Sequence, residues 1–272
     1  MIPRTTSPVA VRLLGGFSMA IDREPVNRWR AGKARGMFQY LLMNRGKLVS
    51  RDRLYEVLWP AAPNASGGSS LKVAAHALRE VLGRTPAEAG LALVCRDRGY
   101  LLRAGDVWTD VDEFERCRAA RDDRAAAELY RDDFLRGEDG DWVVEQREWY
   151  RAAVLRTLDR LREDALRRGD RAELVRWCRR SLELDPYRED TYRTMMAAHA
   201  RSGELDRVVA WYRLCHRRLR DGLGVGPSVE THDLLVEALR HGLTPTGPGG
   251  VRLTAPGAQG RRGSPVLLRS SA

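Results

Sequence analysis

The chain has 272 residues, 43% of them hydrophobic, a composition that suits two globular domains better than an intrinsically disordered chain. No apolar run approaches the roughly 18 residues of a membrane helix, and the N-terminus lacks a signal-peptide core, so we expect a cytoplasmic protein with no membrane partner. The net charge is +10, and residues 1–104 hold the whole excess, with 17 Lys and Arg against 7 Asp and Glu. Such a domain suits polyanion binding, and a solvated basic surface without a partner is an equal alternative.

The residue types that usually carry catalysis or metal binding are scattered. Cys95, Cys117, Cys178 and Cys215 form no CxxC pair, so we expect buried free thiols rather than a zinc site or a disulfide framework. The chain has no GxxxxGK[ST] loop, GxSxG elbow or HExxH pair, and its five histidines do not combine at ligand spacing. We therefore predict a protein that is not an enzyme and has no catalytic residue, metal or cofactor.

The first hundred residues show the element order of a winged helix-turn-helix domain. Short strands with Gly and Pro punctuation are followed by three amphipathic helices, and the second helix begins after Ser50, a natural N-cap, and ends at Pro60. A hairpin with Arg96, Arg98 and Gly99 at its tip closes the domain. The predicted elements are strands within 9–26, helices over 33–43, 51–59 and 71–83, and a hairpin over 91–103, in a domain spanning 1–106.

From Asp110 onward the sequence is helical in pattern. The pair Gly169-Asp170 recurs as Gly203-Glu204, a separation of 34 that is expected of tetratricopeptide-like helix pairs. We expect an all-α helical repeat domain over 107–242 and, because Gly, Pro, Ser and Ala dominate there, a disordered tail over 243–272. The predicted helices lie near 110–121, 123–135, 141–168, 170–184, 188–201, 204–220 and 228–240.

The third helix of the first domain carries the main candidate DNA contacts. Its apolar spacing places Leu71, Ala75, Leu78 and Leu82 on the core side. The opposite face has groups that suit the major groove, because lysine reaches guanine edges or phosphates, valine touches a thymine methyl, and hydroxyls with free amides hold phosphate. An ordinary amphipathic surface helix is the alternative. The candidates on this face are Ser69, Ser70, Lys72, Val73 and His76.

Five further basic residues are candidate phosphate or minor-groove contacts. Arg96 and Arg98 lie at the predicted wing, where Asp97 lowers the local positive charge, and Arg35, Lys47 and Arg51 flank helix starts. Each of them can equally be a solvated surface residue.

Aromatic residues stand out in the second domain. At helical spacing most of them are expected to be buried packing residues, and any that line a groove between stacked helical hairpins would mark a partner site. They are Trp142, Trp149, Tyr150, Trp177, Tyr187, Trp211 and Tyr212.

Several runs of the sequence are similar to one bacterial family. The runs FLRGEDGDWVVEQREWYR (134–151), LELDPYREDTYRTMMAAHARSGE (182–204) and LGVGPSVET (223–231) closely resemble the bacterial transcriptional activator domain. The runs SRDRLYEVLWP, LKVAAHALREVLG and RGYLLR resemble the OmpR-type winged helix of the Streptomyces antibiotic regulatory protein (SARP) family. The resemblance covers about residues 8–242.

This resemblance implies a nucleoid-associated transcriptional activator that binds direct repeats in double-stranded DNA as a homodimer and recruits RNA polymerase, commonly for a secondary-metabolite gene cluster. It also implies that the loop before the recognition helix, with Trp59, Asn64 and Ser66, faces the polymerase. Larger family members add an ATPase domain, and here we expect no ATP dependence.

The alternative is a helical-repeat scaffold or signalling module with a degenerate, non-specific winged helix. Gly68 and Ser69, where family members often carry Arg or Asn, and Asp97 favour the scaffold, whereas the confined charge and Lys72 favour the activator.

Overall fold

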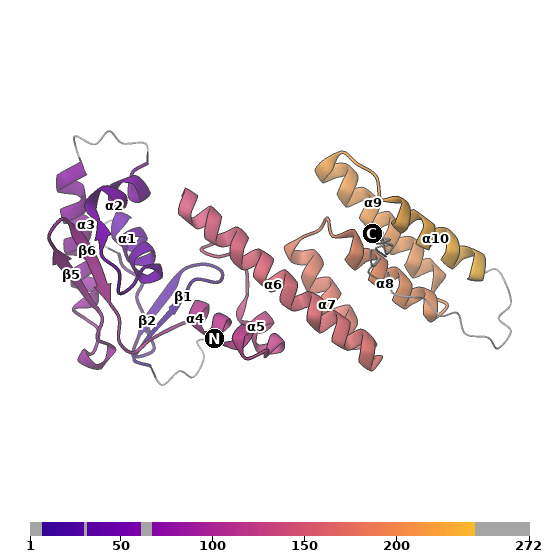
Figure 1. Cartoon of the computed structure of the whole chain (residues 1–272), viewed down its shortest axis with the longest axis horizontal. Helices are drawn as coiled ribbons and strands as arrows, with labels where there is room; N and C mark the ends of the chain where they lie inside the picture. Colours follow the sequence, from indigo (N-terminus) through magenta and orange to yellow (C-terminus); the bar gives the residue numbers. More distant parts are fainter. Residues whose placement is uncertain (1–6, 30–31, 61–66, 243–272) are drawn as a thin grey trace, which may run out of the picture.

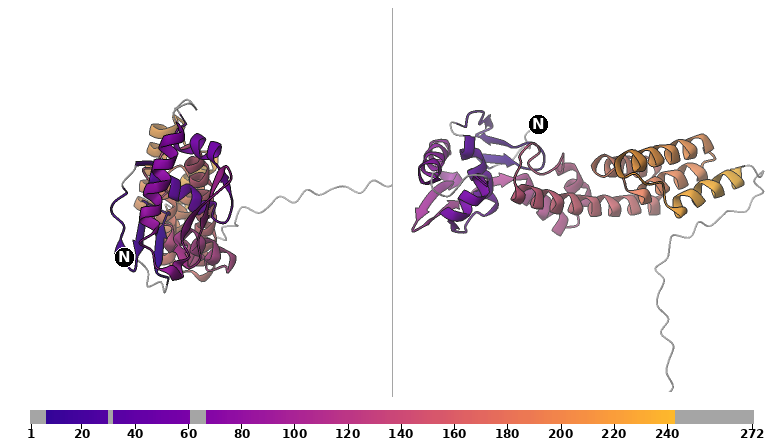
Figure 2. Two further views of the ribbon diagram at one scale, coloured as in Figure 1. Left: turned by 90° about the vertical axis from the view of Figure 1, so that its left-hand side faces the viewer. Right: turned by 90° about the horizontal axis from the view of Figure 1, so that it is seen from above.

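A computed structural model describes residues 7–29, 32–60 and 67–242 (Figure 1). The molecule is elongated, with a mixed domain of strands and helices at one end and helices alone at the other (Figure 2). Within these three ranges, no helix is long and apolar enough to cross a membrane. The tail predicted from residue 243 lies outside the described residues.

The N-terminal domain begins with a sheet of order β3-β2-β1-β7. Its strands are β1 (Val9–Arg12), β2 (Ser18–Ile21), β3 (Glu24–Pro25) and β7 (Val107–Thr109). The first three pair antiparallel, while β7 pairs parallel with β1. Strand β7 lies beyond the boundary predicted at residue 106, so the opening residues of the second region complete the sheet of the first.

Three helices and a second sheet form the rest of this domain: α1 (Gly32–Met43), α2 (Arg51–Leu58), α3 (Gly67–Leu82), β4 (Val49–Ser50), β5 (Ala92–Arg96) and β6 (Gly99–Arg103). The Ser50 hydroxyl accepts a hydrogen bond of 3.1 Å from the Arg53 amide, which satisfies an otherwise unpaired N–H at the start of α2. The predicted helices and hairpin are confirmed, and α3 begins one turn earlier than its apolar spacing indicated.

The second region consists of seven helices among the described residues: α4 (Asp110–Ala119), α5 (Asp123–Leu129), α6 (Asp141–Arg168), α7 (Arg171–Leu184), α8 (Glu189–Arg201), α9 (Leu205–Leu223) and α10 (Val229–Gly242). Gly169 and Gly203 have φ angles of 68° and 70° at the recurring turns, where the left-handed backbone favours glycine. The Asp170 carboxylate caps α7 by accepting from the Glu173 amide at 3.0 Å. The predicted combination of a winged helix and an all-α repeat domain is confirmed.

The helix predicted over 123–135 is wrong beyond Leu129. The chain leaves the helix there and pairs with the loop that follows β1: Leu14 forms a β-bridge with Phe134, and the Leu135 amide donates to Leu13 O at 2.8 Å. Phe134 and Leu135 are fully buried where the loop after β1 meets α6, and not in a continuation of α5. The spacing of apolar residues predicts which side chains are buried, but it does not identify the segment that packs against them.

The joint between the two regions is a continuous hydrophobic core. Tyr40 of α1 meets the Trp142 ring edge-on at 5.2 Å, and Trp142 contacts Phe134, which stacks on Tyr150 of α6 at 5.3 Å. Aromatic pairs at these separations stabilise beyond their buried area. Packing therefore fixes the winged domain against the first helices of the second region.

A buried carboxylate holds the same joint. Asp110, at the start of α4, is fully buried and accepts hydrogen bonds from the amides of Leu13 and Leu14 at 2.8 and 3.0 Å. Loss of solvent raises the pKa of Asp110 to about 6, although these two amides favour its charged form. The carboxylate thus replaces strand partners for two backbone N–H groups.

The cysteine prediction is wrong at one position. Cys117, Cys178 and Cys215 are buried free thiols, whereas Cys95 is exposed. Cys95 lies on β5, at the edge of the sheet of order β4-β6-β5, where a side chain can face solvent.

Candidate nucleic-acid interface

The exposed face of α3 carries the five predicted contacts. Leu71, Ala75 and Leu78 are at most 1% exposed, so they fix the orientation of the helix in the core. The opposite side chains are exposed, and Val73 is unusual among them because 56% of this large apolar residue faces solvent. The five are Ser69, Ser70, Lys72, Val73 and His76. The structure brings them onto one face, and their contact with DNA stays a prediction.

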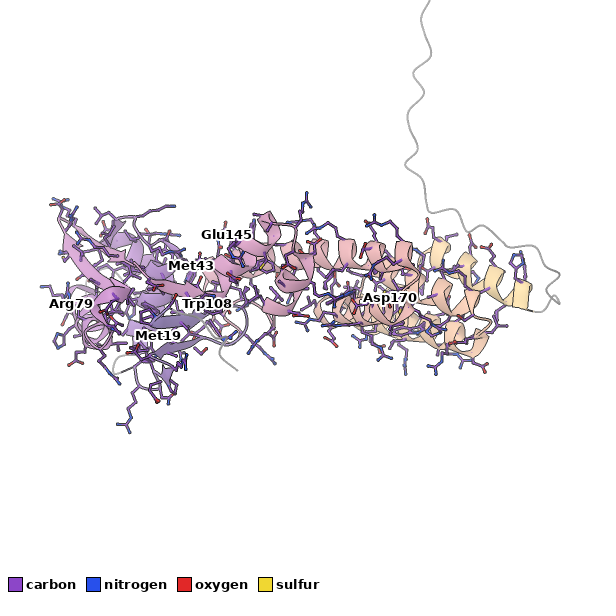
Figure 3. All side chains as sticks on the ribbon, turned by 90° about the horizontal axis from the view of Figure 1, so that it is seen from below. Met19, Met43, Arg79, Trp108, Glu145 and Asp170 are labelled. Atoms are coloured by element: carbon purple, nitrogen blue, oxygen red, sulfur yellow. The ribbon has the colours of Figure 1, made fainter. Side chains whose placement is uncertain are left out.

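Positive charge on this face extends beyond the five predicted residues to Arg79. Lys72 makes no ion pair with any residue in the described ranges, and His76 has only a distant contact, 3.9 Å from Glu80. Arg79 is exposed one turn beyond His76 and lies at the end of the molecule away from the helical domain (Figure 3). Arg79 is not among the predicted contacts, although its spacing of three from His76 places it on the same helix face.

The wing is a two-residue β-turn between β5 and β6. Arg96 pairs with Gly99 across the hairpin, and Asp97 and Arg98 form the tip, with Asp97 at a φ of 44°. A side chain at Gly99 would lie 2.6 Å from Val49 O, so only glycine allows β4 to approach. The side chains of Arg96 and Arg98 are exposed, as expected for a wing, and β5 packs against α3.

The remaining basic candidates differ in what they contact. Arg51 is half-buried, its amide donates to Arg98 O at 2.9 Å, and its guanidinium lies 3.7 Å from the Cys95 sulfur, so it holds the wing to α2. Lys47 is exposed in the turn between α1 and β4, beside the end of β6. Arg35 instead points to the joint, where it pairs with Glu138 at 2.6 Å. Arg51 therefore lies beside the wing tip, Lys47 lies at the opposite end of the β5–β6 hairpin, and Arg35 points away from both.

The loop expected to face polymerase is described only at its start. Trp59 is half-buried and packs against the Tyr55 ring at 5.7 Å, at the end of α2. Asn64 and Ser66 lie outside the described residues.

Two family models match the chain in succession. Residues 30–102 match the C-terminal domain of transcriptional regulatory proteins, and residues 104–239, half of the chain, match the bacterial transcriptional activator domain. In fold, the chain is similar to EmbR of Mycobacterium tuberculosis, solved in complex with a low-affinity phosphopeptide. The TM-score is 0.60 at 23% identity, over 86% of this chain and 66% of that one. This likeness concerns the fold alone.

Curated relatives include two Streptomyces regulators. Over 88% of the present chain, the sequence is 25% identical to the regulatory protein AfsR of Streptomyces griseus. Over 73% of the present chain, it is 29% identical to the transcriptional regulator RedD of Streptomyces coelicolor. It spans 25% of AfsR and 61% of RedD. An OmpR-type winged helix joined to an activator domain that matches over half of the chain is the arrangement of one family, and the chain belongs to it: the Streptomyces antibiotic regulatory protein family of transcriptional regulators.

Proposed function

We propose that the protein is a transcriptional activator that binds double-stranded DNA, with the exposed face of α3 in the major groove and the β5–β6 wing on the neighbouring backbone. One observation carries the proposal. Lys72, Val73 and His76 share an exposed helix face next to the wing, in the domain that holds the entire excess of positive charge. A helix of this width fits the major groove, and excess positive charge favours contact with phosphates.

The side chains divide into base readers and phosphate contacts. Lys72 reaches a guanine edge or a phosphate, His76 donates to either, and Val73 packs on a thymine methyl. Ser69 and Ser70 lie in the first turn of α3, where hydroxyls and free amides together hold a phosphate. Arg96, Arg98 and Arg51 at the wing, and Lys47 at the opposite end of the hairpin, contact the backbone or minor groove.

Two copies bind tandem direct repeats as a homodimer and recruit RNA polymerase, for a secondary-metabolite gene cluster. Membership of the SARP family and the relatives' names, a regulatory protein and a transcriptional regulator, support this part of the proposal. The α2–α3 loop, with Trp59, Asn64 and Ser66, faces the polymerase. The protein acts in the cytoplasm on the nucleoid, without a cofactor.

Selection of duplexes from a random pool by the full chain, at near-physiological salt, tests DNA recognition. We expect enrichment of two direct half-sites about one helical turn apart, because this spacing places both copies of the protein on the same face of the DNA. A pool that stays random would contradict specific binding and favour the scaffold alternative. With the selected site before a promoter, the chain should raise transcription by purified polymerase, and an unchanged yield would contradict recruitment.

Lys72→Ala tests the recognition face directly. Loss of a base contact should weaken binding to the selected site by about 1–3 kcal/mol, and loss of a phosphate contact should flatten the salt dependence by about one unit of slope. Lys33→Ala is the matched control, since Lys33 is an exposed lysine of α1 outside the proposed face. Fluorescence anisotropy measures both quantities. Equal behaviour of the two variants would remove Lys72 from the interface.

A further inference from the structure

Two neighbouring cavities lie on the side of the helical domain that α5, α7 and α9 share. The first, about 620 Å³, lies between α5 and α7. The second, about 370 Å³, lies among α7, α8 and α9. Val175 and Arg179 of α7 line both, so the two cavities form one surface divided by these two side chains.

The walls combine apolar side chains with an excess of positive charge. Trp177 lines the first cavity, Met195 and Trp211 line the second, and Val175 belongs to both. Six arginines and three glutamates line the two cavities. Residues 105–272 as a whole hold 30 basic and 30 acidic residues, so positive charge is concentrated here within a neutral region. A surface of this kind complements a segment that is both acidic and apolar.

One of these arginines differs from its neighbours. Arg171 pairs with Glu204 at 2.7 Å, Arg180 pairs with Glu183 at 2.9 Å, and Arg176 pairs with Glu128 at 3.2 Å. Arg179 is exposed and makes no ion pair or hydrogen bond with any residue that the structure describes. Its five donors are therefore free to bind a carboxylate with both oxygens.

We propose that this surface docks an acidic segment of a partner protein. A carboxylate of the segment forms a bidentate pair with Arg179, and adjoining apolar side chains of the segment rest against Val175 and Trp211. The cavities have the volume of ordinary binding sites and admit several side chains. Trp211 is half-buried and lies between stacked helices, where a large aromatic residue favours protein contacts. This surface is distinct from the proposed DNA-binding face.

Peptide selection on the immobilised full chain tests the proposal. A displayed library of random twelve-residue peptides is selected, and the strongest binders are labelled with fluorescein and titrated by anisotropy. We expect enrichment of Asp and Glu beside aromatic or aliphatic residues. Arg179→Glu should raise the Kd at least tenfold, and so should replacement of the peptide's Asp and Glu by Asn and Gln. Arg179→Gln should give a smaller loss, because it removes the charge without reversing it.

Two matched variants locate the bound peptide. Arg213→Glu changes an exposed arginine of α9 that lines neither cavity, and it should leave the Kd within twofold. Lys72→Glu, on the winged domain, should do the same. A selection without acidic enrichment, or peptides that lose affinity with Lys72→Glu and not with Arg179→Glu, would overturn the proposal. Loss of DNA binding with Arg179→Glu would also overturn it and would place nucleic acid on this surface.

Discussion

At the outer end of the winged domain, Lys72, Arg79 and Arg98 make no ion pair with any described residue, whereas most arginines of α4–α8 contact a carboxylate. A guanidinium that already has a carboxylate has fewer donors and less unbalanced charge left for a phosphate. Unpaired cations are therefore more available to a ligand, whereas paired ones contact a carboxylate of their own helix or of a neighbouring segment. Net charge identifies the basic domain, and we expect the pattern of ion pairing to separate ligand-binding arginines and lysines from structural ones.

Removal of a structural arginine should give the largest effect. Arg162 of α6 has a 10% exposed side chain and pairs with Asp190 at 2.7 Å and Asp159 at 3.1 Å. Arg162→Ala leaves these carboxylates without their buried partner and should lower the free energy of unfolding by about 3–5 kcal/mol. Arg188 also contacts Asp159 and Asp190 and would still partner them in the variant, so we expect a loss near the lower end of this range. Urea denaturation measures the change.

Arg167→Ala is the control for a paired arginine at the surface. Its side chain is 77% exposed and pairs with Asp164 at 3.2 Å, so its loss should cost at most about 1 kcal/mol. If the two variants were equally stable, burial would not decide the strength of these pairs.

In the joint, Asp110 is held by backbone amides, and its stability contribution should depend on pH. The unfolded chain titrates this carboxyl near 3.8, and burial raises the pKa to about 6 in the folded protein. The folded state therefore binds the proton more tightly. The stability that the protonated form contributes is complete below about pH 4 and is lost as the pH rises through 6.

Comparison with Asp110→Asn isolates this group, because the other carboxyl groups are common to both chains. The unfolding free energy of the wild-type chain relative to the variant should fall on the order of 2–3 kcal/mol between pH 4 and pH 7. Thermal or urea denaturation across that range measures it. A difference that does not change with pH would contradict the assigned burial of the charge.

The wing should show the next effect. Arg98→Ala removes an unpaired cation, so the slope of log K against log salt for DNA binding should flatten by about one unit, with a loss on the order of 1 kcal/mol. Arg136→Ala, whose exposed side chain pairs with Asp132, should leave the slope unchanged. A flattened slope in both variants would show that pairing does not restrict which arginines meet DNA.

Local patterns were sufficient to predict most elements of the fold and the exposed face of α3. The Ser50 cap, the two-residue wing and the buried side of α3 depend on residues within a few positions of each other. The predictions that were wrong concern residues whose packing partners are distant in the sequence. Apolar spacing predicts a helix through Phe134 and Leu135 because it reflects burial, but the loop after β1, which pairs with them, is far away in sequence.

The same limit applies to the candidate site. Lys72 and His76 were found because a helix face can be read from spacing, and Arg79 could have been found in this way. Arg35 looked like a phosphate contact because it lies near a helix start, yet Glu138, from a segment predicted to be outside that domain, contacts it. A local sequence pattern cannot predict an ion pair between residues as far apart in the sequence as Arg35 and Glu138.

Arg35→Ala should have the smallest effect and separates the two kinds of arginine most directly. The Arg35 side chain is 47% exposed, so loss of its pair with Glu138 should lower the free energy of unfolding by at most about 1 kcal/mol. A double-mutant cycle with Glu138→Ala should give a coupling of about 0.2–1 kcal/mol, while the Kd for DNA stays within twofold in either single variant. If Arg35→Ala instead weakened DNA binding severalfold at unchanged stability, a paired arginine near the joint would be a DNA contact, and ion pairing would no longer distinguish structural arginines from DNA-binding ones.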